Sequence, residues 1–229
     1  MKTKQSLISN LRLLGPCFLL GFLLTPVTAV GQAPDFEEML ELASQGEAYA
    51  QYNLGVSYTN GQGVPQDDKA AVKWYSLAAE QGNAKAQSNL GLMYNTGQGV
   101  PQDYKAAVKW YSLAAEQGHA FAQNNLGVMY RNGEGVPQDY KAAVKWHSLA
   151  AEQGNADAQT NLGVMYGEGE GVIQDNVYAH MWFNIAASSG DSENASKGRD
   201  IVAEIMTTAQ IAEAQKLARE CVRKEYKGC

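Results

Sequence analysis

The 229-residue sequence is poor in the side chains that most often carry out catalysis or bind metals: it has three histidines and three cysteines. His119, His147 and His180 fall at different positions of a 36-residue repeat, one in a turn and two on second helices. This argues against a shared metal site and favours surface or boundary histidines. No serine is followed three positions later by lysine, the arrangement of many β-lactamase nucleophiles. The sequence therefore predicts no catalytic residues, no metal and no cofactor.

An excess of positive charge is also missing, because the formal net charge is -6. Removal of residues 1–29 would take away three positive charges and no acidic residue, giving about -9. Proteins that bind nucleic acid normally present a basic face to the phosphates. We therefore expect no nucleic-acid partner.

Long apolar runs are absent except at residues 13–24, which follow a positively charged start and precede the small residues Val27-Thr28-Ala29. This order is typical of a secretory signal peptide, predicted here over residues 1–29. A membrane anchor is the alternative, but crossing a bilayer takes about 20 apolar residues. Lipidation of Cys17 is disfavoured because Pro16 precedes it. We expect a periplasmic or secreted protein, without stable membrane insertion after the signal is cleaved.

The mature chain would keep two cysteines, Cys221 and Cys229, close together at its end. In an oxidising compartment such a pair is expected to form a disulfide, which could contribute about 2–3 kcal/mol to stability. Two free thiols are the alternative if the protein is not exported.

One segment of the sequence occurs three times with almost no change, at residues 70–82, 106–118 and 142–154, and a more divergent copy lies at 178–190. Its tryptophans are 36 residues apart, at Trp74, Trp110, Trp146 and Trp182. A fixed period between about 20 and 50 residues is typical of stacked-repeat proteins. We predict the following divisions: a starting helix at 34–46, four repeats at 47–82, 83–118, 119–154 and 155–190, and a C-terminal helical cap at 191–229.

Each repeat is predicted to contain two helices. In the first, apolar residues four apart share one face, and Gly55 in mid-helix costs about 1 kcal/mol relative to alanine. A close approach of the partner helix would offset this cost. In the second, Asp67 is placed to cap the N-terminus, and Ala71, Trp74 and Ala78 form an apolar stripe. In the C-terminal cap, Thr207 and Gln210 predict a capping box.

Several short motifs of the first repeat resemble the Sel-1-like repeat, a relative of the tetratricopeptide repeat: Ala50-Gln51, Leu54-Gly55, Gly61-Gln62-Gly63-Val64, Trp74-Tyr75 and Ala78-Ala79-Glu80-Gln81-Gly82. The 36-residue step also differs from the ordinary tetratricopeptide unit of about 34. The resemblance implies an all-α fold, a right-handed α/α superhelical solenoid of antiparallel helix pairs. It also implies an adaptor for protein complexes. A cysteine-rich branch of the family is linked to penicillin binding and β-lactam hydrolysis, but it carries a disulfide in each repeat, and this sequence has no cysteine between Cys17 and Cys221.

In tetratricopeptide arrays the first helix of each pair lines a concave surface. By alignment on Leu54-Gly55, the resemblance places in this groove Tyr49, Tyr52, Asn53, Lys85, Asn89, Phe121, Asn124, Asn125, Arg131 and Asn161.

Three chemistries stand out in this set. The ladder of Asn53, Asn89, Asn125 and Asn161 could donate to and accept from a peptide backbone, or could bond its own helices and the neighbouring turn. The aromatic residues could be binding hot spots, although Tyr49 and Tyr52 could instead pack against the starting helix. Lys85 and Arg131 could bind an acidic residue or a chain terminus.

These features predict an exported, non-enzymatic adaptor that binds a protein or peptide through its concave face. Two alternatives stay open. One is β-lactam hydrolysis or penicillin binding, by analogy with the cysteine-rich relatives. The other is binding of peptidoglycan or another glycan, with Tyr49, Tyr52 and Phe121 as stacking platforms.

Overall fold

The structure is a computed structural model that describes residues 36–189 and 193–229. The predicted signal peptide lies outside these residues. Within them the regular elements are eleven α-helices and no strand, which confirms the all-α prediction. No helix of this described part is long and apolar enough to cross a membrane.

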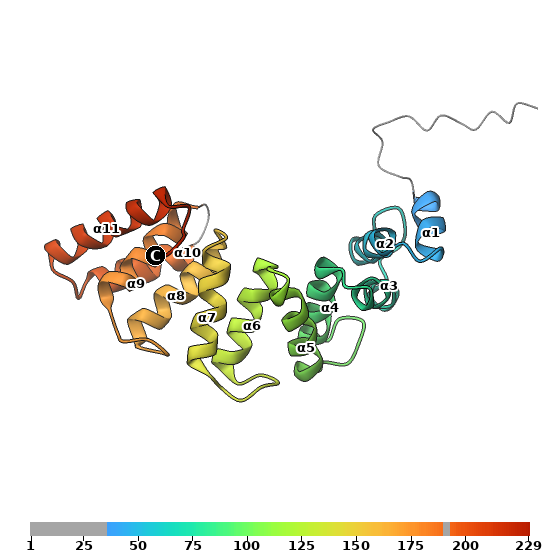
Figure 1. The fold of residues 1–229 in the computed structure, drawn as a ribbon, viewed down its shortest axis with the longest axis horizontal. Helices are drawn as coiled ribbons and strands as arrows, with labels where there is room; N and C mark the ends of the chain where they lie inside the picture. Colours follow the sequence, from blue (N-terminus) through green and yellow to red (C-terminus); the bar gives the residue numbers. More distant parts are fainter. Residues whose placement is uncertain (1–35, 190–192) are drawn as a thin grey trace, which may run out of the picture. The chain divides into compact units, whose positions relative to one another are not determined.

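The helices follow one another with short connections (Figure 1). Their bounds are α1 Phe36–Ser44, α2 Ala48–Asn60, α3 Asp68–Glu80, α4 Ala84–Thr96, α5 Tyr104–Glu116, α6 Ala120–Asn132, α7 Tyr140–Ala151, α8 Ala156–Glu168, α9 Asn176–Ser188, α10 Glu193–Ala203 and α11 Thr208–Arg223.

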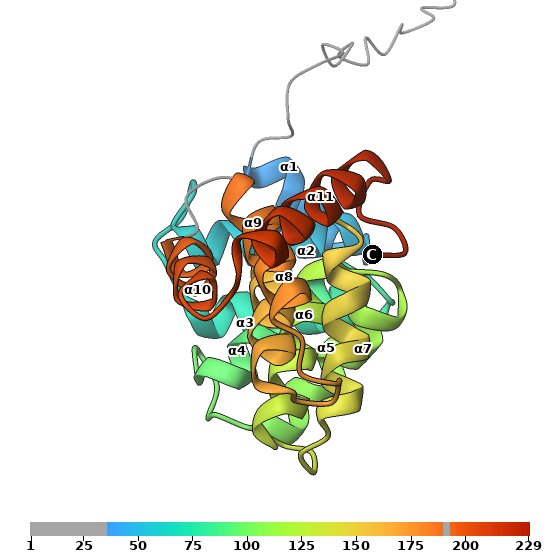
Figure 2. The same cartoon turned by 90° about the vertical axis from the view of Figure 1, so that its left-hand side faces the viewer.

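The helices pack as consecutive pairs, α2 with α3, α4 with α5, α6 with α7 and α8 with α9. Each second helix also packs on the first helix of the next pair, as the order of colours in Figures 1 and 2 shows. At the start of the array α1 packs on α2. At its end α10 packs on α8 and α9, and α11 lies against α9. Each repeat is therefore one helix pair.

The ends of the helices follow from local sequence. Asp67 Oδ1 accepts hydrogen bonds from the backbone N–H groups of Lys69 and Ala70, both at 3.0 Å, which confirms the predicted N-cap of α3. The equivalent aspartates cap the other second helices: Asp103, Asp139 and Asp175. Such a cap contributes about 1 kcal/mol. Each first helix is followed by a glycine with positive φ; after α2 this is Gly61, with φ of +67°.

The glycine in the middle of each first helix receives a ring from the second helix. Gly55 faces Tyr75, and the three later pairs are Gly91 with Tyr111, Gly127 with His147 and Gly163 with Phe183. The close approach predicted for this glycine is confirmed, but a side chain and not a helix backbone makes it. An added Cβ on Gly91 would lie 2.7 Å from the ring of Tyr111, so only glycine leaves room.

One residue of the predicted apolar stripe of the second helix is buried less than the others. Ala71, Tyr75 and Ala78 are buried, whereas Trp74 is only half-buried. Trp74 packs against the buried cluster of Ala43, Ala50 and Leu54 on α1 and α2, and the ammonium of Lys73 lies 5.7 Å from the centre of its ring. The second and third repeats have the same lysine–tryptophan contact at 5.0 and 5.2 Å. The indole is thus partly covered by a cation, which is favourable.

Glutamine side chains connect successive repeats. Gln87 of α4 donates from Nε2 to the Ala79 carbonyl of α3 at 3.1 Å, and accepts at Oε1 from Gln117, the residue after α5, at 2.7 Å. The same two bonds recur one repeat later. In the fourth repeat Ser189 stands where the donating glutamine would be, and Gln159 Oε1 has no hydrogen-bond partner among the described residues. The glutamine of the Ala-Gln motif is therefore a structural link.

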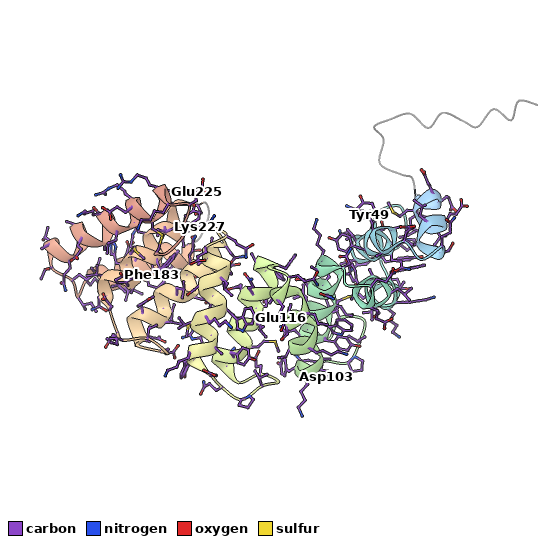
Figure 3. All side chains as sticks on the ribbon, viewed as in Figure 1. Tyr49, Asp103, Glu116, Phe183, Glu225 and Lys227 are labelled. Carbon is purple, nitrogen blue, oxygen red and sulfur yellow. A yellow bond between two sulfur atoms is a disulfide. The ribbon has the colours of Figure 1, made fainter. Side chains whose placement is uncertain are left out.

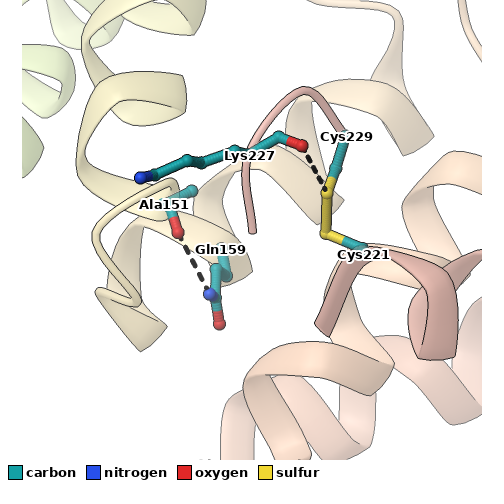
Figure 4. Close-up of a disulfide and its surroundings, with 5 residues drawn as sticks. All are labelled: Ala151, Gln159, Cys221, Lys227 and Cys229. Carbon is teal, nitrogen blue, oxygen red and sulfur yellow. Dashed lines mark hydrogen bonds between the residues drawn. A yellow bond between two sulfur atoms is a disulfide. The ribbon is translucent and has the colours of Figure 1, made fainter. Parts of the chain in front are cut away.

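The C-terminal cap contains both predicted constraints. Thr207 and Gln210 form the capping box of α11. Cys221 and Cys229 form the predicted disulfide, with their Cα atoms 5.5 Å apart. The returning chain brings Tyr226 against Gly154, and Figure 4 shows the disulfide beside the Gln159–Ala151 hydrogen bond. This short loop adds a contact with the end of the third repeat to the packing of α10 and α11 on the last helix pair.

Candidate functional site

The three most exposed of the predicted binding residues, Tyr49, Lys85 and Phe121, occupy one repeated position, the second residue of each first helix, where the fourth repeat has Asp157. The side chains there are Tyr49 on α2, Lys85 on α4, Phe121 on α6 and Asp157 on α8, 36 residues apart. All four are exposed, Tyr49 to 67% and Phe121 to 40%, and Figure 3 labels Tyr49 on α2. We call these four residues the variable row. Packing does not dictate the side chain at this position, so each repeat can present a different chemistry.

The asparagine ladder is largely engaged within the protein. Asn125 donates to the Phe121 carbonyl of its own helix at 2.8 Å, and Asn161 donates to Asn124 Oδ1 at 3.0 Å. Asn89 hydrogen-bonds the buried hydroxyl of Tyr75 in the preceding repeat. These bonds match the alternative that the amides support neighbouring helices. Asn53 differs, since its buried Nδ2 has no partner among the described residues.

The third repeat has a buried polar cluster where the sequence predicted surface residues. Asn124 is only 7% exposed, so its predicted position in an open groove is wrong, and its Oδ1 lies 3.1 Å from His147 Nδ1. His147 is fully buried because it replaces the tyrosine that fills the space over Gly127. His180 is also buried, at 3% exposure. The prediction of surface or boundary histidines is therefore wrong for both.

Arg131 and Tyr52 make contacts that reduce their availability to a ligand. Arg131 donates from Nε to Glu170 at 2.6 Å and from Nη2 to Glu168 at 2.9 Å. These two ion pairs link α6 to the last residue of α8 and to the turn that follows it. Its charge is thus compensated within the chain. Tyr52 is half-buried and its ring lies 6.0 Å from the ring of Tyr75, so it packs within its own repeat.

Burial lowers the pKa of His147 to about 4, and the nearby Arg131 charge acts in the same direction. The unfolded chain would take up this proton near pH 6.5. The folded state is therefore fully favoured above pH 6.5 and loses stability as the pH falls toward 4.

We expect His147→Phe, which copies Phe183 of the fourth repeat, to remove part of this acid sensitivity. The wild-type chain should lose about 3 kcal/mol more than the variant between pH 7 and pH 4. Urea unfolding of both chains at the two pH values measures the difference. Equal losses in both chains would show that His147 does not titrate as described.

Two equivalent pockets that the sequence did not predict lie at the turns between helices. One, of about 630 Å³, is lined by Tyr58, residues 65–69 and Gly99. The other, of about 550 Å³, is lined by Tyr130, residues 137–141 and Gly171. Both exist because a turn glycine of one repeat lies against the start of the second helix of the repeat before it. Among the described residues no group of three or more histidine, cysteine or acidic side chains could hold a metal ion.

Comparisons with known proteins agree with this geometry. The family described as Sel1 repeat matches residues 48–83, 84–119, 120–155 and 156–191, each one residue later than the units set by the tryptophan period. No match was found among proteins with curated descriptions.

The solved structures that are similar to this chain include two repeat proteins. One is c5321, a protective antigen present in uropathogenic Escherichia coli strains displaying an SLR fold, with 38% identity and a TM-score of 0.70. The match covers 84% of this chain but 45% of that protein, so this chain spans less than half of its length. The other is a Sel1 repeat protein from Oxalobacter formigenes, with 36% identity, a TM-score of 0.62, and coverage of 81% and 69%.

Sel1 repeats commonly form scaffolds for protein–protein interaction. Four consecutive matches, the glycine–ring contact in every helix pair and the likeness to two such solenoids lead to one conclusion. The chain belongs to the Sel1 repeat family.

Proposed function

We propose that this protein is a non-enzymatic adaptor that binds a segment of another protein across the exposed sides of its first helices, with the variable row as the main contact. One observation carries the proposal. The repeats keep the same or similar side chains at most packed positions, but differ in chemistry at an exposed position of each first helix, which holds tyrosine, lysine, phenylalanine and aspartate. Packing of the repeats on one another requires no such variety, whereas recognition of a particular partner does.

The chemistry of the row indicates what the partner would offer. Phe121 and Tyr49 are exposed aromatic side chains, a type enriched at binding hot spots. Lys85 lies between them in the order of repeats. Burial of the His119 ring lowers the pKa of that histidine, and the nearby Lys85 charge acts in the same direction. A partner segment with apolar side chains and an acidic residue opposite Lys85 would match this surface.

We further propose that the protein acts outside the cytoplasm. The predicted signal sequence supports this, and the Cys221–Cys229 disulfide is in keeping with an oxidising compartment. Glycan binding is the competing function, because Tyr49 and Phe121 of the variable row could also stack against sugar rings.

We expect Phe121→Ala to weaken partner binding by about 2 kcal/mol, roughly 30-fold, because truncating an aromatic hot spot removes most of its contact. Leu113→Ala is the matched control, since Leu113 is 38% exposed but lies on the second helix α5. Affinity capture from envelope extract identifies the partner, and titration with that purified partner measures both variants.

Loss of binding in both variants, or in neither, would contradict the proposed surface. Two further measurements separate the alternatives. If the wild-type protein sediments with purified peptidoglycan, glycan binding is favoured. If it hydrolyses a chromogenic β-lactam, an enzymatic function is favoured.

A further inference from the structure

A second surface that could bind a partner lies at the end of the array, between α9 and α11. It is a pocket of about 600 Å³. Its apolar part comes from Ile185, Ala218 and Val222, and its charged part from Lys216, Arg219 and Arg223. No acidic side chain lines it. The pocket therefore combines an apolar floor with a cationic rim, on a chain whose net charge is -6.

The cations face outward because the other side of α11 is used for packing. Ala214, Ala218 and Cys221 are buried, and α11 covers Trp182, which is 4% exposed while the other three tryptophans are half-buried. In this repeat Met181 replaces the lysine that lies over the other indoles, so no cation on α9 repels α11.

The three cations share one side of α11, at spacings of three and four residues. Among the described residues Arg223 has one ion pair, with Glu220 at 3.9 Å, and Lys216 and Arg219 have none. A local concentration of positive charge such as this attracts an anionic partner.

Helix α1, at the other end of the array, is acidic where α11 is basic. The outer side of α1 exposes Glu37, Glu38 and Glu41 around the half-buried Leu40, and α1 contains no lysine or arginine. These residues line a depression of about 600 Å³. Since α1 is the first helix in the packing order and α11 the last, the two ends of the array carry opposite charges.

We propose that a second copy of this chain docks its α1 onto the pocket between α9 and α11. Glu37 and Glu41 of one copy pair with Lys216 and Arg219 of the next, and Leu40 contacts the apolar floor at Val222, which is 44% exposed. The contact is head-to-tail, because each copy uses a different surface on each side. Such heterologous contacts produce rings or open chains of copies.

Analytical ultracentrifugation of the full chain tests the proposal. The average mass should rise with protein concentration at about 0.01 M salt and fall toward the monomer at about 1 M, because the Debye length shortens from about 30 Å to about 3 Å. Lys216→Glu with Arg219→Glu, and separately Glu37→Lys with Glu41→Lys, should each weaken self-association about tenfold or more.

A chain with both pairs of reversals should regain self-association, because its two ends are again opposite in charge. Restoration cannot arise from a folding defect. Lys105→Glu with Lys141→Glu is the control for the reversal on α11, since it lowers the net charge by the same amount as Lys216→Glu with Arg219→Glu, but at exposed lysines of α5 and α7. The proposal is overturned if the wild-type chain stays monomeric at low salt, if the control weakens association as much, or if the combined reversal stays monomeric.

Discussion

Replacing Gly135 by alanine should destabilise the protein by about 2–5 kcal/mol. Gly135 has a φ of +72°, a region that costs an alanine about 1–2 kcal/mol. The added Cβ would also meet the backbone of the preceding repeat, 2.5 Å from the carbonyl carbon of Tyr104 and 2.9 Å from the nitrogen of Lys105. Because these are main-chain atoms at the start of α5, no side chain can rotate away, and overpacking adds about 1–3 kcal/mol.

Gly118→Ala is the matched control for this change. Gly118 has a φ of +86° but no atom that an added Cβ would meet within 4 Å. It should therefore show only the backbone cost of about 1–2 kcal/mol. Urea unfolding followed by circular dichroism measures both variants. Equal destabilisation by Gly135→Ala and Gly118→Ala would mean that the repeats do not approach as closely as the structure indicates.

Truncating Tyr111 should be as damaging, because its ring fills the space over Gly91 and is fully buried. Removing a buried aromatic side chain leaves a cavity and typically costs about 3–5 kcal/mol, so we expect Tyr111→Ala to unfold at a much lower urea concentration. The loss should be local to the second repeat and its neighbours, since each repeat contacts mainly the adjacent ones.

Tyr111→Phe separates the role of the ring from that of the hydroxyl. The Tyr111 hydroxyl is buried with no hydrogen-bond partner among the described residues, and burial raises its pKa. Deleting an unpaired buried hydroxyl should be neutral or stabilising. Tyr75→Phe should cost about 1 kcal/mol instead, because the Tyr75 hydroxyl lies 3.2 Å from Thr59 Oγ1. Equal effects of Tyr75→Phe and Tyr111→Phe would contradict this difference between the repeats.

The repeat made much of the fold predictable. The tryptophan period located the helix pairs, and Asp67 and Thr207 marked helix starts that the structure confirms. The period could not tell which residue of the Trp74-Tyr75 pair is buried, because two adjacent positions on a helix are only about 100° apart. The buried one is set by the partner helix, where Gly55 leaves room for a ring.

The binding surface was less predictable, for a physical reason. Alignment within the repeat identifies equivalent positions, but the neighbours of a side chain decide whether it is available. Asn124 occupies a predicted groove position yet is buried, because it lies against His147 of the next helix, α7, and hydrogen-bonds it. Arg131 is neutralised by glutamates 37 and 39 residues away in sequence. The cationic pocket depends on α11 folding against α9, which no local pattern encodes.

Site-specific photo-crosslinking tests the central claim most directly, that the first helices present the partner-binding surface. A benzophenone amino acid at position 121 on α6 and, separately, at position 113 on α5 would be activated in the native envelope. We predict a discrete crosslinked protein from position 121 and none from position 113. Crosslinks from position 113 alone, or the same products from both positions, would contradict a binding surface on the first helices.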